Sequence, residues 1–197
     1  MYIKNDFNHR IIVSKSEFII YTRRIKNELE YKNFVSEIKK KHYDATHCCS
    51  AFYTKNIQRS SDDGEPAKTA GIPILNAIIN EDLIECAVVV VRYFGGVKLG
   101  ANGLIRTYRD VTSKTLKLAP KINEELYPLY EIKITYEYGD KVIKWLQNNA
   151  KYVKVDYGLD ITVCYASKNN FQPEIENIIR QRIEIKDIGH HLIATDV

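Results

Sequence analysis

The chain has 197 residues, of which 45% are hydrophobic and 27% are charged, and its formal net charge is +4 at pH 7. This composition is typical of a globular protein that can bury a real core, and the length allows one large domain or two small ones. The mildly basic balance permits an anionic partner such as RNA but does not require one, because a solvated mixed-charge surface has the same composition.

Neither a targeting segment nor a membrane span is expected. The apolar run at residues 87–91 is far too short to cross a bilayer, and residues 1–6 are too polar for a signal peptide. The four cysteines form no CxxC pair, which fits reduced thiols in a reducing compartment. We therefore expect a soluble, cytoplasmic protein without a membrane partner.

The first predicted elements are two short strands and a helix. Residues 10–13 and 18–22 are rich in β-branched and aromatic side chains, which favours strands. Asn27 can cap a helix, with Glu30 three residues later completing a capping box. The apolar residues of this helix recur at helical spacing, and three lysines follow in its last turn: Tyr31, Phe34, Val35, Ile38, Lys39, Lys40 and Lys41.

A buried strand is predicted at residues 46–53, where His47 lies next to two cysteines. Zinc is disfavoured there, because adjacent strand residues point to opposite faces and cannot converge on one ion. We expect a hydrogen-bonded histidine near a site. The turn that follows carries three carboxylates around Gly64, at Asp62, Asp63 and Glu65. Such a turn can bind a cation, pair with arginine or remain solvated.

The predicted helix at 74–79 leads to a continuous apolar strand at 86–91 that should be covered on both faces. Arg92 ends this strand. An arginine that leaves a buried strand needs a carboxylate partner. The sequence therefore predicts an ion pair between Arg92 and one of the three acids in the preceding turn.

A glycine-rich loop leads into the next helix. Gly95 and Gly96 permit close backbone approach, and Gly100 opens a helix that should end near Leu118. Its predicted inward residues are Leu104, Ile105, Tyr108, Val111 and Leu116. The glycine spacing matches neither the Walker A motif nor the dinucleotide fingerprint. A generic anion pocket at the helix start and a plain turn with a helix cap both remain open.

Two prolines bracket a polar stretch at 119–128, which predicts a boundary between domains at 1–120 and 125–197. The second domain has the pattern β-α-β-β-α-β of a ferredoxin-like split βαβ fold. Its strands and helices are predicted at residues 131–136, 140–149, 152–157, 159–165, 171–181 and 182–188. We expect an α+β protein.

Four segments of the chain resemble the YigZ/IMPACT family in its two-domain bacterial form, a family of uncharacterised proteins. They are Lys15-Ser16-Glu17-Phe18, His47-x-Cys49-x-Ala51-Phe52, Ser61-Asp62-Asp63-Gly64-Glu65-Pro66 with Thr69-Ala70-Gly71-Ile72-Pro73, and Arg92-Tyr93-Phe94-Gly95-Gly96-x-x-Leu99-Gly100. The family usually has Gly-Thr-Gly-Gly where this chain has Gly100-Ala101-Asn102-Gly103.

The resemblance implies an N-terminal α/β domain like domain IV of elongation factor G, with the left-handed βαβ unit of a ribosomal protein. It implies a C-terminal ferredoxin-like domain similar to domain V of the same factor. Eukaryotic relatives act in translational control by binding a protein that activates a stress kinase. No reaction is implied for the bacterial relatives.

Three functions follow as hypotheses. The first is a non-enzymatic protein that binds RNA, the ribosome or a ribosome-associated protein in translation or its regulation. Its anion- or nucleic-acid-binding residues would come from the glycine loop and the helix after it: Arg92, Tyr93, Gly95, Gly96, Lys98, Gly100, Arg106 and Arg109. The second, an enzyme, would use magnesium on the acidic turn and His47 as a general base beside Arg92.

The third hypothesis is a protein-interaction module whose acidic loop docks a basic partner. That loop site comprises Asp62, Asp63 and Glu65, with His47 beside them. The sequence has no recognisable spacing of a nucleophile, a base and a residue that orients the base, which argues against the enzymatic hypothesis. The sequence accordingly assigns no catalytic residue, no metal ligand and no cofactor.

Overall fold

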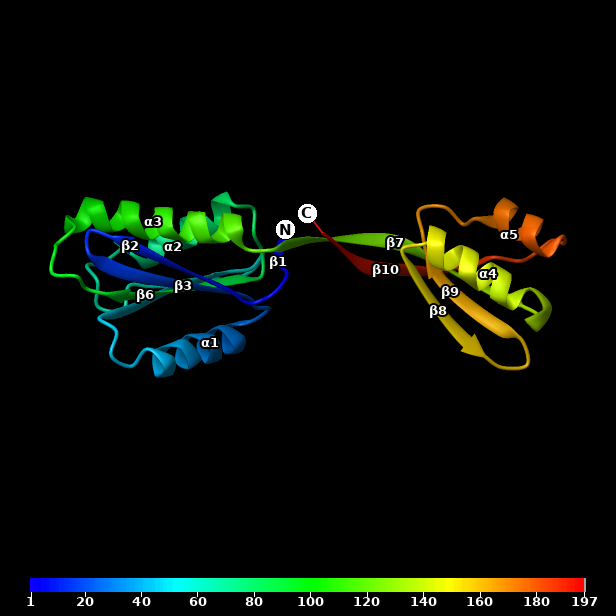
Figure 1. The fold of residues 1–197 in the computed structure, drawn as a ribbon, viewed down its shortest axis with the longest axis horizontal. Coiled ribbons are helices and arrows are strands. Elements are labelled where there is room, and N and C mark those ends of the chain that lie inside the picture. Colours follow the sequence, from blue (N-terminus) through cyan, green and yellow to red (C-terminus); the bar gives the residue numbers. More distant parts are fainter. Residues whose placement is uncertain (197) are drawn as a thin grey trace. The chain divides into compact units, whose positions relative to one another are not determined.

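The computed structural model describes residues 1–196, which form a mixed α+β fold with five helices and two five-stranded sheets (Figure 1). The chain forms two compact units, one built mainly from Met1–Asn123 and one from Glu124–Thr195. None of the helices within residues 1–196 is both long and apolar enough to cross a membrane.

The first unit contains an antiparallel sheet with the strand order β2-β3-β6-β4-β5. Its elements in chain order are β1 Tyr2–Ile3, β2 Phe7–Val13, β3 Ser16–Arg24, α1 Glu28–Lys41, β4 His47–Tyr53, β5 Gln58–Ser61, α2 Gly71–Asn80, β6 Cys86–Tyr93 and α3 Gly100–Leu118. Helices α2 and α3 cover one face of the sheet, and α1 covers the other (Figure 1).

The central strand β6 explains the continuous apolar run in the sequence. Val88 and Val90 lie in the core beneath α2 and α3, whereas Val89 and Val91 lie in the core beneath α1. All four side chains are fully buried. A strand with both faces covered has no polar side, which confirms the prediction made from its composition.

Helix α1 begins as its capping signal predicts. The side chain of Asn27 accepts a hydrogen bond from the backbone N–H of Glu30 at 3.0 Å. The Glu30 carboxylate reaches back to the N–H of Lys26 at 2.9 Å, one residue before the cap. The predicted apolar face is buried at Tyr31, Phe34 and Ile38, so the capping and periodicity signals agree.

Helix α3 has the predicted bounds, but one of its predicted core residues is wrong. Leu104, Tyr108, Val111 and Leu116 are buried, whereas Ile105 is 39% exposed. Helical spacing does not explain this exposure, because the adjacent residues Val111 and Thr112 are both buried; what packs over the start of α3 decides it. Polar side chains complete the buried stripe instead, at Thr107, Thr112 and Thr115.

The second unit has the expected order of elements: β7 Lys121–Ile134, α4 Tyr136–Asn149, β8 Tyr152–Tyr157, β9 Ile161–Ala166, α5 Gln172–Ile179 and β10 Lys186–Asp196. The strands lie in the order β10-β7-β9-β8. One face of this sheet is covered by α4 and α5, whose buried residues are Val142, Ile143, Leu146, Ile175 and Ile179. This is the sheet order of a split βαβ unit.

Three element bounds predicted in this half were wrong. The first strand, expected at 131–136, is β7, which starts at Lys121 and takes in much of the polar stretch at 119–128; the carbonyl of Pro128 accepts a hydrogen bond there from the N–H of Ser167. A proline removes a donor but keeps its acceptor, so it can stand at this point of a strand. Leu159 is fully exposed in the turn before β9, and the last strand starts at Lys186 rather than at 182.

Candidate functional site

The acidic turn at Asp62, Asp63 and Glu65 is held by internal hydrogen bonds. One oxygen of Asp62, Oδ1, accepts the N–H groups of Ala70 at 3.0 Å and Gly71 at 2.8 Å, where α2 begins. Its other oxygen, Oδ2, accepts the N–H of Lys68 at 2.8 Å. Burial raises the pKa of Asp62, but these three N–H groups outweigh burial and hold the pKa below its usual value. Asp62 therefore caps a helix.

The second acid, Asp63, fastens the turn to strand β4. Its carboxylate accepts the N–H of Cys48 at 2.7 Å and pairs with the ammonium of Lys39 at 2.5 Å. This hydrogen bond raises the pKa of Lys39, against a smaller effect of burial. The ring Nδ1 of His47 lies 3.0 Å from the carbonyl oxygen of Asp63, to which it donates. His47 is thus the hydrogen-bonded strand histidine that the sequence predicts.

Glu65 is the partner of Arg92, which confirms the predicted ion pair. The guanidinium Nη1 donates to Glu65 Oε1 at 2.6 Å, and the two side chains are only 5% and 3% exposed. The hydroxyl of Tyr108 donates to the same oxygen at 2.7 Å. Nε2 of His47 lies 3.8 Å from Glu65 Oε2. Burial, foremost, raises the pKa of the Tyr108 hydroxyl, so it stays a donor in this network.

The guanidinium of Arg92 is only partly satisfied. Nη2 donates to the hydroxyl of Ser16 at 3.3 Å. Nε is buried and has no hydrogen-bond partner among the described residues. A buried N–H without an acceptor is uncommon in folded proteins and calls for an explanation.

The glycine loop runs from Gly95 to Gly100. Gly95 is tightly packed, whereas Gly96 and Gly100 are not. A Cβ on Gly95 would lie 1.8 Å from the carbonyl oxygen of Lys15. Gly96 and Gly100 have φ of +84° and +70°, with open space around them. Helix α3 starts at Gly100 without a side-chain cap from Leu99 and without an acidic residue in its first turn.

The acidic turn and the glycine loop line one cavity of about 340 Å³, which we call the turn–loop cavity. Five of the residues predicted from the sequence line it: His47, Glu65, Arg92, Lys98 and Gly100. The other lining residues are Thr46, Pro66, Phe94, Leu99, Ala101 and Leu104. Pro66, Phe94 and Leu99 belong to the signature segments, and Phe94, like Tyr93, could stack on a base from the sequence alone. Thr46 and Leu104 lie outside those segments and carry no signal in the sequence.

The electrostatics of the turn–loop cavity favour an anion. Its acidic residue, Glu65, is neutralised by Arg92. Lys98 is exposed and makes no ion pair with any residue in 1–196. The uncapped start of α3 adds the partial positive charge of a helix amino terminus.

The remaining predicted residues lie outside this cavity. Asp62 and Asp63 brace the turn, and Gly95 and Gly96 shape the loop. The Tyr93 hydroxyl lies 2.9 Å from Nδ1 of His42 and donates to Asp44 at 3.1 Å. Arg106 is exposed on α3, and Arg109 pairs with the neighbouring Asp110 at 2.8 Å.

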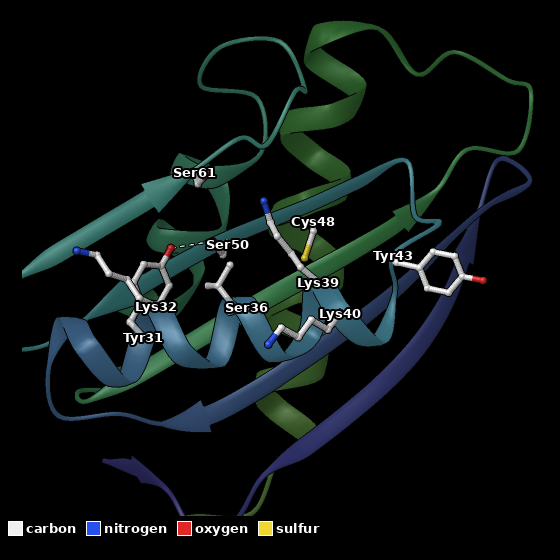
Figure 2. A pocket seen from close by; sticks show the side chains of 10 residues that line it. Tyr31, Lys32, Ser36, Lys39, Lys40, Tyr43, Cys48, Ser50 and Ser61 are labelled. Carbon is white, nitrogen blue, oxygen red and sulfur yellow. Dashed lines mark hydrogen bonds between the residues drawn. The ribbon is translucent and has the colours of Figure 1, made fainter.

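A second cavity of about 570 Å³ lies beside α1 (Figure 2). Figure 2 shows it between the helix and the strands β4 and β5, with the Tyr31 hydroxyl bonded to Ser50 at 2.7 Å. Lys32 and Lys39 line it but are paired with Glu28 and Asp63. Burial, with a smaller effect of Asp63, raises the pKa of the Cys48 thiol to about 11, so it is not a nucleophile at neutral pH.

Metal ligation finds little support in the geometry. Among residues 1–196, no group of three or more His, Cys, Asp and Glu side chains is arranged to hold a metal ion. The carboxylates that the enzymatic hypothesis assigned to magnesium are engaged with backbone N–H groups, Lys39 and Arg92.

Comparisons with known proteins identify the family. The Impact N-terminal domain matches residues 14–116. The IMPACT family member YvyE of Bacillus subtilis (strain 168) is 37% identical over 155 residues, which cover 77% of this chain and 71% of that relative. The IMPACT family member YigZ of Escherichia coli (strain K12) is 34% identical over 131 residues, covering 64% of this chain and 63% of the relative.

A solved structure supports the fold over nearly the full length. The crystal structure of a hypothetical protein superposes with a TM-score of 0.58 at 24% identity and covers 95% of this chain and 96% of its own. This neighbour bears on the fold alone. The matched domain and the similarity to YvyE place the chain in the IMPACT family.

Proposed function

We propose that this chain is a non-enzymatic binding protein linked to translation or its regulation, acting through RNA, the ribosome or a ribosome-associated protein. The observation that carries the proposal is the turn–loop cavity, where both signature segments of the chain meet around Lys98 and the start of α3. The resemblance of the two units to domains IV and V of elongation factor G belongs to the same proposal, as do residues 1–120 and 125–197 as separate domains.

The side chains around this cavity suit binding better than catalysis. A catalytic or metal-binding carboxylate has to be free to contact its substrate or ion. Asp62 and Asp63 are bonded to backbone N–H groups, and Glu65 is held by Arg92 and Tyr108. The same bonds speak against a loop that offers its acids to a basic protein partner.

The enzymatic alternative would place a hydrolytic or phosphoryl-handling site around His47, Asp62, Asp63, Glu65 and Arg92. Its strongest support is His47, which lines the cavity and has its ring oriented by the Asp63 carbonyl. Asp63→Asn separates the two cases. If Asp63 is structural, the variant protein should be less stable. If Asp63 is catalytic, the variant should lose turnover and still bind its ligand.

The test is co-sedimentation with ribosomes of the host at low and high salt. Three proteins are compared: wild type, Lys98→Ala, and the Arg106→Ala/Arg109→Ala double variant. We expect pelleting that weakens steeply with salt, because each phosphate contact releases counterions. Loss of pelleting in Lys98→Ala places the contact at the cavity, and loss in the double variant places it on the exposed face of α3.

Nuclease treatment separates the partners. Pelleting that survives digestion of the RNA would point to a ribosome-associated protein. The absence of pelleting at every salt concentration would contradict the proposed function.

A further inference from the structure

We propose that the turn–loop cavity binds a nucleoside monophosphate unit, either as a free nucleotide or as part of an RNA chain. The phosphate would lie at the start of α3 and the base against Phe94. This inference deepens the proposed function, on which it rests for the RNA source of the ligand. It assigns a chemical class to the site and a role to each end of the cavity.

The phosphate end is formed by Lys98, Gly100 and Ala101, all of which line the cavity. The first N–H groups of a helix have no partner within the helix. Here Leu99 supplies no side-chain cap and the first turn has no acid. Lys98 stands next to this helix start, exposed and without an ion pair among residues 1–196. Free N–H groups and one unpaired ammonium form a binding site for phosphate oxygens.

The second, independent observation is the partnerless donor of Arg92 in the cavity wall. The side chain of Arg92 is 5% exposed and lines the cavity, and its Nε has no acceptor within the described part of the chain. Its other two nitrogens are bonded to Glu65 and Ser16. Nε is fully covered as the structure stands, so an anion in the cavity becomes its acceptor only when the guanidinium shifts toward it.

Glu65 does not repel such a ligand. The carboxylate accepts hydrogen bonds from Arg92 at 2.6 Å and from Tyr108 at 2.7 Å, so its charge is compensated within the wall. His47 is the other titratable lining residue on this side, with Nε2 3.8 Å from Glu65. Neither group adds an unpaired negative charge.

The base end is apolar. Phe94 lines the cavity with Leu99 and Leu104, and the residue is 45% exposed. The guanidinium carbon of Arg92 lies 5.5 Å from the centroid of this ring. A half-exposed ring beside a phosphate site is a stacking platform for one base. The volume of about 340 Å³ is near the lower end of ligand pockets, about 300–1,000 Å³, which suits one nucleotide.

The test is a calorimetric titration of the full chain with AMP, adenosine and inorganic phosphate. We expect AMP to bind at least tenfold more tightly than adenosine. Lys98→Ala should weaken AMP binding by fivefold or more. Its matched control, Lys114→Ala, removes an exposed lysine of α3 that does not line the cavity, and should leave AMP binding unchanged.

Phe94→Leu tests the base end. It should weaken AMP binding about fivefold or more and leave the binding of inorganic phosphate unchanged. Displacement of AMP by a short single-stranded RNA would make an RNA chain the source of the ligand. The absence of displacement, with AMP still bound, would make it a free nucleotide.

Equal affinity for adenosine and AMP would overturn the phosphate assignment, and equal loss in Lys98→Ala and Lys114→Ala would overturn its location. The nucleotide-binding inference and the proposed function can be contradicted independently, because one is read out by nucleotide binding and the other by ribosome pelleting. Ribosome pelleting without any nucleotide binding would sink this inference and leave the proposed function intact. AMP binding of the expected pattern without pelleting would support the inference and contradict the proposed function.

Discussion

At the scale of single residues, a buried ion pair connects the acidic turn to the end of β6, where the glycine loop begins. Arg92 and Glu65 are almost completely buried and form an ion pair between the end of β6 and the acidic turn. Such pairs add little net stability compared with apolar residues, but breaking one leaves an uncompensated charge in the interior. The pair therefore determines where the loops lie more than how stable the unit is.

We predict that Arg92→Ala lowers the free energy of unfolding of the first unit by about 3–5 kcal/mol. Glu65→Ala should have a similar effect, because it leaves the buried guanidinium of Arg92 without its carboxylate partner. The Arg92→Leu/Glu65→Leu double variant should lose much less than the sum of the two single losses, since neither charge is left alone. Chemical denaturation measures all four proteins, and additive losses would contradict a coupled pair.

Asp62 makes the stability of the first unit depend on pH. Its pKa is lowered in the fold, so its contribution is present above the unfolded pKa of about 3.9 and is lost as pH falls through the folded pKa. We predict that Asp62→Ala costs about 0.5–2 kcal/mol at pH 7 and that this difference shrinks in acid. Asp110→Ala is the control, because that side chain is 61% exposed and should change little. Thermal melts at several pH values check both.

At the scale of elements, the hairpin β2–β3 and the glycine loop fit against each other. Val13 pairs with Ser16, so the turn has only two residues, Ser14 and Lys15, with φ of 48° and 66°. Both values are positive, as a type I′ turn requires. The carbonyl of Lys15 leaves no room for a Cβ on Gly95.

We predict that Gly95→Ala destabilises the first unit more than Gly96→Ala. The first places a Cβ into a backbone carbonyl at 1.8 Å, which the hairpin can relieve only by moving. The second meets no atom within 4 Å and carries only the strain of φ +84°, which costs about 1–2 kcal/mol for a residue with a Cβ. Denaturation midpoints of the two variants measure the difference, and equal midpoints would contradict the packing argument.

At the scale of the whole molecule, each unit has its own core. Ile78 is fully buried in the core of the first unit beneath α2 and α3, and Leu146 is fully buried in the core of the second. Strand β7 begins in the first unit, where Lys121 and Ile122 pair with β1, and continues into the second. Separate cores are the physical basis on which two regions can unfold separately.

We predict that Leu146→Ala costs the second unit about 2–5 kcal/mol and leaves the first nearly unchanged, with Ile78→Ala giving the reverse pattern. Native-state hydrogen exchange of amides in β6 and β9 reads out the two units separately. Loss of protection in both strands from either substitution would mean that the chain unfolds as a single cooperative unit.

Local signals in the sequence predicted much of the fold. Asn27 and Glu30 marked the start of α1, and the continuous apolar run marked β6 as covered on both faces. The errors fell where local signals compete with pairing, as in the polar part of β7 and at Ile105. Strand pairing and the exact burial of a helix face are decided by neighbours that a local pattern does not contain.

By itself, the sequence determined that Arg92 needs an acid and that an acidic turn and a glycine loop carry the special residues. The tertiary structure alone decided that Glu65 is that acid, that Asp62 caps α2, and that the two segments enclose one cavity with Phe94 and Lys98. The physical reason is separation along the chain. Arg92 lies 27 residues from Glu65 and 76 from Ser16, and only packing of the sheet against its helices brings such groups within hydrogen-bond distance.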